Sequence, residues 1–118
     1  KFVPFSKIFP RVFCVVHHGG SNTVAACFAA GAPQIVVPTY GGFDQVDNGQ
    51  RVVALDAGAV LSRRNLTAAK LVVAIKAMSR YRSSCRMVQE KMQEAAPKTL
   101  SMICAFVESL IGRDRGRV

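Results

Sequence analysis

One stretch of this sequence restricts the fold more than any other. An apolar run at residues 12–16, two glycines, an alanine-rich segment at 23–30 and a second apolar run at 34–38 follow one another directly. Short continuous apolar runs are typical of strands buried on both faces of a parallel sheet. Gly31 and Pro33 are suited to end the helix between them. The stretch therefore predicts a strand–helix–strand unit with a right-handed crossover.

The rest of the chain continues the alternation and then becomes helical. Residues 39–49 predict a loop, a short helix follows it, and GAVLS at 58–62 predicts a third strand. Further helices are expected at 67–80, 83–95 and 97–111. Asn65 or Thr67 can cap the first of them, and Pro97 suits the first turn of the last. An apolar stripe is expected on the first helix (Leu71, Ile75 and Met78) and on the last (Leu100, Ile103, Val107 and Leu110). This order predicts an α/β chain: a partial doubly wound, Rossmann-like parallel sheet with helices at its C-terminal end.

Length and charge limit the organisation and the partners. A chain of 118 residues with 50% hydrophobic residues can build one core, so residues 1–118 are expected to form a single domain or part of one. The formal net charge of +9 suits a phosphorylated ligand, nucleic acid or an anionic membrane, and does not choose among them. The basic C-terminal tail leaves a peripheral membrane contact open as an expectation.

The cysteines and the hydropathy pattern indicate the compartment. Four cysteines without CxxC spacing predict reduced thiols in a cytoplasmic protein, without disulfides or a zinc site. No apolar run reaches the roughly 20 residues that span a bilayer, so a membrane-crossing segment is not expected.

The chemistry is expected where the first strand ends. There Gly19 and Gly20 let the backbone approach a ligand closely, and the following helix start directs free N–H groups at an anion. Ser21, Asn22 and Thr23 add short polar side chains. The His18 ring can donate a hydrogen bond to the same anion. This pattern is consistent with a phosphate-binding turn, and equally with a tight strand-to-helix turn that binds nothing.

Other sites are excluded or disfavoured by the sequence. There is no GxxxxGK[ST] and no GxGxxG opening a helix. Thr23 stands where a GxSxG nucleophile motif needs glycine, which makes Ser21 a poor nucleophile. His17 and His18 are adjacent on a strand and point to opposite faces, so they do not predict a metal site. A non-catalytic basic module that binds phosphate or nucleic acid remains the alternative from another functional class.

Four segments together resemble a known family. VPFSKIFPR, VVHHGGSNT, AAGAPQIVVP and FDQVDNGQRV occur in the order and nearly the spacing of the C-terminal nucleotide-sugar-binding domain of GT-B glycosyltransferases of family 1. The bacterial rhamnosyltransferase and sterol glucosyltransferase type is most similar. The resemblance extends from about Phe2 to Leu61 and more loosely to about Leu110.

The resemblance implies a function and a set of contacts. The family transfers a hexosyl group from a nucleotide sugar to a hydroxyl acceptor, with inversion and without a metal or other cofactor. It implies that four residues of the glycine turn hold the diphosphate of a UDP- or dTDP-sugar: His18, Gly20, Asn22 and Thr23. It also implies that Asp44 and Gln45 bind the hydroxyls of the transferred sugar.

The resemblance has three departures and one large absence. Asn22 stands where bacterial relatives usually have a glycine. Ala26 stands where plant members have a glutamate for the ribose, and the loop between Pro38 and Asp44 is about two residues longer than usual. The family's catalytic histidine belongs to an N-terminal acceptor domain, which is absent from this sequence. We therefore expect no catalytic residue in this chain and a requirement for the acceptor domain as partner. Residues 1–118 alone are expected to transfer no sugar and to bind nucleotide sugars weakly or not at all.

Overall fold

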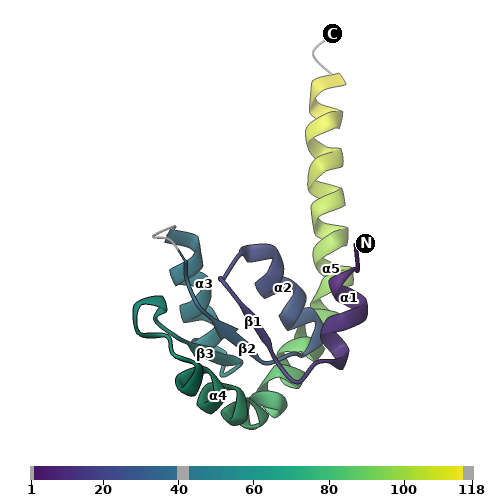
Figure 1. Ribbon diagram of the computed structural model, residues 1–118. Helices are drawn as coiled ribbons and strands as arrows, with labels where there is room; N and C mark the ends of the chain where they lie inside the picture. The colour runs from purple at the N-terminus through teal and green to yellow at the C-terminus, as the bar shows by residue number, and fades with distance from the viewer. Residues whose placement is uncertain (1, 40–42, 116–118) are drawn as a thin grey trace.

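The computed structural model describes residues 2–39 and 43–115, and in this part of the chain three parallel strands form the centre. They are β1 (Val15–His17), β2 (Gln34–Val36) and β3 (Gly58–Val60), in the order β1-β2-β3 (Figure 1). The predicted α/β fold with a parallel sheet is confirmed. Each strand has three residues, so the helices supply most of the packed surface.

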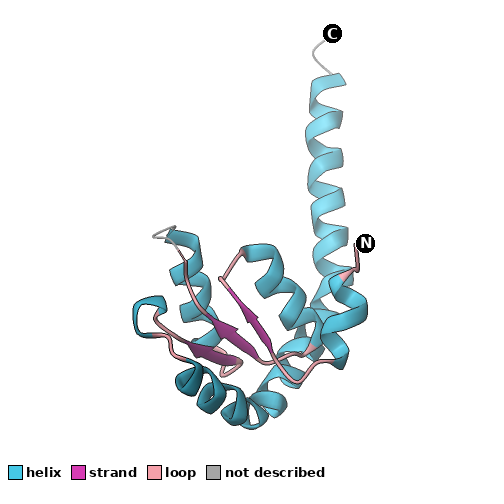
Figure 2. Cartoon of the chain, viewed as in Figure 1, coloured by secondary structure: helices cyan, strands magenta, loops and turns pink. Residues whose placement is uncertain are grey.

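Two crossover helices connect these strands (Figure 2). Helix α2 (Ser21–Ala30) joins β1 to β2, and α3 (Phe43–Ala54) joins β2 to β3. Both crossovers run in the same direction along the sheet, which puts α2 and α3 side by side and in contact on one face. Because α2 and α3 each begin just beyond the carboxyl end of a strand, their first turns lie at the same edge of the sheet.

The second face of the sheet is covered by the C-terminal helices. These are α4 (Ala68–Ala77), the 3-10 turn η3 (Met78–Tyr81) and the start of α5 (Arg82–Arg115). The remaining short elements are α1 (Phe5–Ile8), η1 (Phe9–Arg11) and η2 (Arg63–Asn65).

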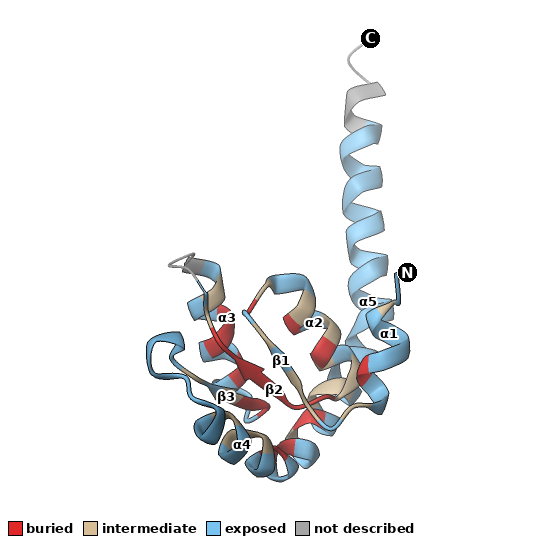
Figure 3. Cartoon of the chain, in the orientation of Figure 1, coloured by how far each residue is buried: buried red, intermediate tan, exposed pale blue. Residues whose placement is uncertain are grey.

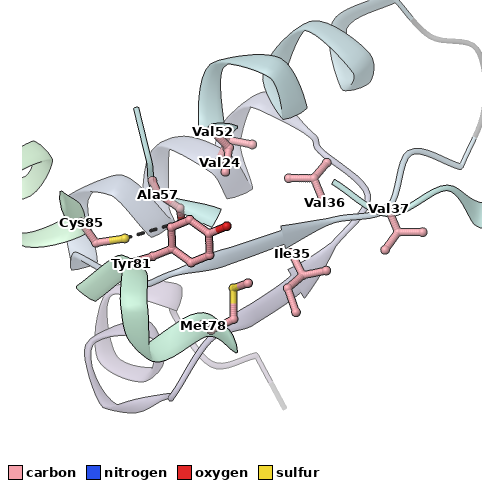
Figure 4. Packing of buried hydrophobic residues seen from close by; sticks show 9 residues of the cluster. All are labelled: Val24, Ile35, Val36, Val37, Val52, Ala57, Met78, Tyr81 and Cys85. Carbon is pink, nitrogen blue, oxygen red and sulfur yellow. Dashed lines mark hydrogen bonds between the residues drawn. The ribbon is translucent and has the colours of Figure 1, made fainter. Parts of the chain in front are cut away.

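The core consists of apolar side chains on both faces of β2 (Figure 4). Val36 points toward Val24 of α2 and Val52 of α3, whereas Ile35 points toward Met78 on the opposite side. Ile35, Val36 and Val52 have no exposed surface. This two-sided burial explains why the neighbouring residues Ile35 and Val36 are both apolar, instead of alternating with polar residues.

Of the two candidate caps of α4, Asn65 and Thr67, the structure has Thr67 in this role. The side chain of Thr67 accepts a hydrogen bond of 3.2 Å from the backbone N–H of Lys70. The predicted apolar stripe on this helix also packs as expected, because Met78 is buried in the core and Leu71 and Ile75 lie against it.

The predicted starts of β1 and α3 are wrong. β1 begins at Val15, not at residue 12, because Phe13 has turned toward α5: Arg82 donates to the Phe13 carbonyl at 3.3 Å and stacks over its ring. α3 begins at Phe43, within the segment that the sequence predicts as a loop. Residues 43–49 contain polar residues and a glycine, but they gain helical structure by packing on β2 and β3.

The prediction of two C-terminal helices separated at Pro97 is also wrong. α5 runs without a break from Arg82 to Arg115, with Pro97 inside it. Proline removes one backbone hydrogen bond from a helix interior. Residues 91–112 are all exposed, so water can satisfy the carbonyl that this leaves unpaired.

The second half of α5 projects from the body of the molecule (Figures 1 and 3). Its predicted apolar stripe packs against nothing in the described structure, and Leu100 and Phe106 are 63% and 64% exposed. The continuous helical region Ala68–Gly112 is long and apolar enough to cross a membrane, judged by length and composition alone. The expectation that the sequence contains no such segment is therefore not supported.

Candidate functional site

The turn between β1 and α2 has a conformation that requires glycine. Gly19 has φ +97°, and a Cβ atom there would lie 2.9 Å from the backbone oxygen of Gln45 and 2.9 Å from Cγ1 of Val36. Non-glycine residues rarely adopt this φ. The close approach also brings the two predicted parts of the site, the turn and the start of α3, into direct contact. Gly19 is thus the residue of this turn with a positive φ, and Asn22 already belongs to helix α2.

His17 fixes the turn from within. Its Nδ1 accepts a hydrogen bond of 3.0 Å from the backbone N–H of Gly19, so the ring proton is on Nε2. Nε2 then donates to Oε1 of Gln34 at 2.9 Å. Burial lowers the pKa of His17, and nearby His18 lowers it further, while the hydrogen bond to Gln34 opposes both effects. His17 is therefore a neutral histidine at pH 7 that holds the turn in place.

The start of α2 presents unpaired backbone N–H groups. Its N-cap is Gly20, which has no side chain to cap the helix. The first backbone N–H of the helix with a hydrogen bond to the turn belongs to Val24, which donates to the Gly20 carbonyl at 3.0 Å. Within the described residues, the amides of Ser21, Asn22 and Thr23 have no acceptor. These three groups and the positive end of the helix dipole form an anion-binding position.

His18 lies beside these amides. It is exposed, and its ring lies over Gly20, where a Cβ atom would be 2.9 Å from Nε2 of His18. The absence of a side chain at position 20 thus makes room for the ring. An anion at the start of α2 would lie within reach of both the imidazole and the backbone.

The predicted pair Asp44 and Gln45 lies in the first turn of α3, not in a loop. Oε1 of Gln45 accepts hydrogen bonds from the backbone N–H of Thr39 at 3.0 Å and from its hydroxyl at 3.4 Å. The oxygen is thereby occupied, and among the residues that the structure describes the NH₂ group of Gln45 has no acceptor and remains as a donor. Asp44 is exposed, and an acid in a helix first turn is also favoured by the dipole.

Sequence reasoning missed Asn48. Its side-chain NH₂ donates to the Gly19 carbonyl at 2.9 Å and to the Ser21 hydroxyl oxygen at 3.0 Å. Asn48 is buried and lies about one helical turn after Gln45, on the same side of α3. Helical spacing within FDQVDNG was the signal that would have found it, had this segment been predicted as helix.

An apolar groove lies next to the predicted site but does not include it. With a volume of about 1050 Å³, it is formed between the outer side of α3 and the carboxyl ends of β2 and β3. Val46, Val53 and Val60 line it, and Thr39 connects it to Gln45. Arg63 lies at its edge and donates to the Thr39 carbonyl at 2.9 Å. The residues of the turn do not line this groove.

The described residues contain no group of three or more histidine, cysteine, aspartate or glutamate side chains placed to bind a metal. The four cysteines are free in the structure. Cys27 and Cys85 are buried, and Cys104 on α5 is exposed.

Comparison with known proteins gives consistent results in sequence and structure. Residues 1–107 match the family described as erythromycin biosynthesis protein CIII-like, C-terminal domain. The sterol 3-beta-glucosyltransferase of Vanderwaltozyma polyspora is 30% identical over 110 residues, which cover 90% of this chain and 9% of that protein. The enzyme of the same name from Eremothecium gossypii is 42% identical over 74 residues, which cover 63% of this chain and 6% of that protein.

Among solved structures, the calicheamicin glycosyltransferase CalG4 is similar in fold. It superimposes with a TM-score of 0.77 and 27% sequence identity, over 95% of this chain and 29% of CalG4. The chain thus spans under a tenth of the length of the two sterol glucosyltransferases and under a third of CalG4.

Proposed function

The chain belongs to the family of erythromycin biosynthesis protein CIII-like C-terminal domains and is by family part of a GT-B glycosyltransferase. From this premise we propose that it binds the diphosphate of a nucleotide-sugar donor at the start of α2. The observation that carries the proposal is the start of α2, where the amides of Ser21, Asn22 and Thr23 have no acceptor in the described part of the chain and lie next to the exposed ring of His18. Backbone N–H groups at a helix N-terminus are suited to phosphate oxygens.

Gln45 and Asp44 extend the proposed site toward the sugar. Because Thr39 occupies the oxygen of Gln45, the side-chain NH₂ can donate to a sugar hydroxyl, and the exposed Asp44 carboxylate can accept from one. The backbone of Gln45 touches Gly19, so a sugar attached to a diphosphate at α2 would lie beside the start of α3.

The proposed reaction is an inverting transfer without a metal. An acceptor hydroxyl attacks the anomeric carbon, the bond from this carbon to the diphosphate oxygen breaks, and the sugar changes configuration. The diphosphate leaves with additional negative charge, which the α2 amides and His18 would stabilise in place of a cation. The donor is proposed to be a UDP- or dTDP-sugar, with no other cofactor.

The proton of the acceptor hydroxyl requires a base. Both ring nitrogens of His17 are engaged, with Gly19 and with Gln34, and His18 is assigned to the diphosphate. We therefore propose that the base and the acceptor site belong to another part of the glycosyltransferase.

Titration of UDP and dTDP, followed by the amide signals of residues 18–24 in ¹⁵N-labelled protein, tests donor binding. We expect saturable shifts at these residues, and weaker binding in His18→Ala than in the parent. Arg86→Ala, which changes an exposed residue of α5, is the control. An oligonucleotide that bound tightly with a steep salt dependence, while UDP failed to compete, would instead favour the nucleic-acid-binding alternative.

We also propose a cytoplasmic location with a peripheral contact between α5 and an anionic membrane. The exposed apolar residues of α5 after Pro97 form one broad arc: Leu100, Met102, Ile103, Phe106, Val107, Leu110 and Ile111. Lys98, Ser101 and Glu108 lie on the other side of the helix. Between Lys98 and Arg113 the helix measures about 21 Å, less than the roughly 30 Å of the hydrocarbon core, which favours lying in the interface over crossing it.

Charge supports an anionic surface as the partner of α5. The chain has a formal net charge of +9, and Arg113, Arg115 and Arg117 follow the apolar arc in the sequence. Each basic residue near an anionic membrane contributes about 1 kcal/mol to binding. A two-stranded coiled coil would need only a narrow apolar stripe, whereas the arc on α5 is wide.

A further inference from the structure

The hydroxyl group of Ser21 can donate a hydrogen bond to a ligand or accept one from it. The structure shows that Asn48 determines which of the two it does. Its hydroxyl oxygen accepts a hydrogen bond of 3.0 Å from the side-chain NH₂ of Asn48. A hydroxyl that accepts one hydrogen bond still has its own O–H to donate. Ser21 is exposed and makes no other side-chain hydrogen bond within the described residues, so its O–H is available at the start of α2.

Asn48 acts on the turn at a second point. The same NH₂ group donates to the Gly19 carbonyl at 2.9 Å. This carbonyl belongs to the residue with φ +97°, and its hydrogen bond holds the peptide that leads into α2. Both hydrogens of the amide group are thus used on the turn, one on the backbone and one on Ser21.

We propose that Asn48 is a positioning residue of the donor site, which holds the Gly19 peptide and directs the Ser21 hydroxyl to donate to an anionic oxygen of the ligand. The inference rests on the proposed binding of a diphosphate. Asn48 is 6% exposed and 29 residues from Gly19 in the sequence, and it need not touch the ligand.

The same geometry explains why asparagine suits position 48 better than aspartate. Aspartate at position 48 would have nearly the same shape but only acceptor oxygens when ionised. The Ser21 O–H would then turn inward to donate to this carboxylate. The ligand would meet an oxygen lone pair and a buried negative charge instead of a donor, both unfavourable for a diphosphate.

The test measures binding of UDP and inorganic pyrophosphate to the parent, Asn48→Asp, Ser21→Ala and the double variant. Asn48→Asp should weaken UDP binding by at least about tenfold, since a charge-assisted hydrogen bond is lost and a like charge is added. Ser21→Ala should weaken it by a smaller factor. In the Ser21→Ala background the Asn48→Asp change should cost a smaller factor than in the parent, a coupling that a purely structural role of Asn48 would not produce.

Asn65→Asp is the matched control, because it makes the same replacement on an exposed residue of η2. Amide spectra of all variants show whether they fold. If Asn48→Asp does not fold, Asn48→Ser takes its place in the cycle, because serine removes the amide donors without adding a charge.

The outcomes separate this inference from the proposed function. If the parent binds neither UDP nor pyrophosphate, the donor-site proposal fails, and the role of Asn48 fails with it. If the parent binds UDP while Asn48→Asp binds as Asn65→Asp does, or if the effects of positions 48 and 21 are simply multiplicative, the inference is overturned and the donor site stands.

Discussion

Nε2 of His17 donates to Oε1 of Gln34 across the β1–β2 pair at 2.9 Å, and Gln34 has no exposed surface. The other end of the Gln34 amide donates to the Val24 carbonyl in α2 at 3.4 Å. A single buried side chain therefore joins the strand, the turn that follows it and the crossover helix. Because the turn contains the proposed diphosphate site, the stability of this junction and ligand binding are connected.

Replacing Gln34 by leucine should destabilise the fold. Leucine is similar in size but leaves the His17 N–H without its acceptor, and an unsatisfied buried group costs about 1–3 kcal/mol. The free energy of unfolding in urea should fall by about that amount or more. Gln50→Leu, at an exposed position of α3, is the control. Equal stability of the two variants would mean that the Gln34 hydrogen bonds contribute nothing.

The stability of the chain should depend on pH through His17. Burial lowers its pKa below the ordinary value of 6.5, so the unfolded chain binds a proton first as the pH falls. The contribution is complete above about pH 6.5 and decreases below it. Protonation of Nδ1 would also remove the acceptor of the Gly19 N–H.

Thermal unfolding between pH 7.5 and pH 5 measures this effect. The loss of stability on acidification should be smaller in His17→Gln than in the parent and should persist in His18→Gln. His18 is exposed and makes no hydrogen bond like that of His17 in the described structure. A parent and a His17→Gln variant with the same pH dependence would contradict the prediction.

Gly19→Ala should damage the turn, whereas Gly112→Ala should not. Alanine at position 19 combines an unfavourable φ with contacts of 2.9 Å to Gln45 and Val36, which should cost about 1–3 kcal/mol and weaken UDP binding. A Cβ at Gly112 meets nothing within 4 Å, and alanine there should stabilise the exposed helix by up to about 1 kcal/mol. Urea unfolding of both variants and UDP titration of Gly19→Ala give the comparison. A Gly19→Ala variant with the stability and affinity of the parent would show that the close contact can relax.

The parts of the fold that the sequence predicts are those set by local pattern. The apolar run at β2, the glycine turn and the cap at Thr67 each follow from neighbouring residues. The start of α3 at Phe43 does not, because polar residues and Gly49 in that segment favour a loop unless the helix packs on β2. The continuous helix α5 was not predictable either. Proline is favoured in the first turn of a helix, so Pro97 predicts the start of a new helix and not the interior of a long one.

The candidate site also has residues that the sequence predicts and residues that it does not. His18 and the segment from Gly19 to Thr23 are contiguous, so their position at a helix start was predictable. Gln34 and Asn48 contact the turn from 17 and 29 residues away, and these contacts exist only once β1 pairs with β2 and α3 packs beside α2. Helical spacing can place Asn48 on the same side of α3 as Gln45, but no local pattern shows that this side meets the turn.

The cysteines should differ strongly in reactivity. Burial raises the pKa of Cys27 to about 12, and burial together with nearby Asp56 raises that of Cys85 to about 11. Because the thiolate is the reactive form, an aromatic disulfide reagent at pH 8 should modify the exposed Cys104 first and Cys27 and Cys85 slowly. All four should react in guanidinium chloride. Labelling of Cys27 as fast as that of Cys104, read by mass spectrometry, would contradict the packing of α2.

The proposed membrane contact of α5 predicts selective binding to anionic vesicles. The chain should sediment with phosphatidylglycerol vesicles and little with phosphatidylcholine vesicles, and less at high salt, because basic residues supply part of the attraction. Leu110→Asp, within the apolar arc, should weaken binding, whereas Ser101→Asp adds the same charge on the opposite side and should weaken it less. Equal effects of the two variants would assign the attraction to net charge alone. If the chain binds no vesicles and Leu110→Asp instead abolishes a concentration-dependent dimer, the apolar arc is a protein–protein interface.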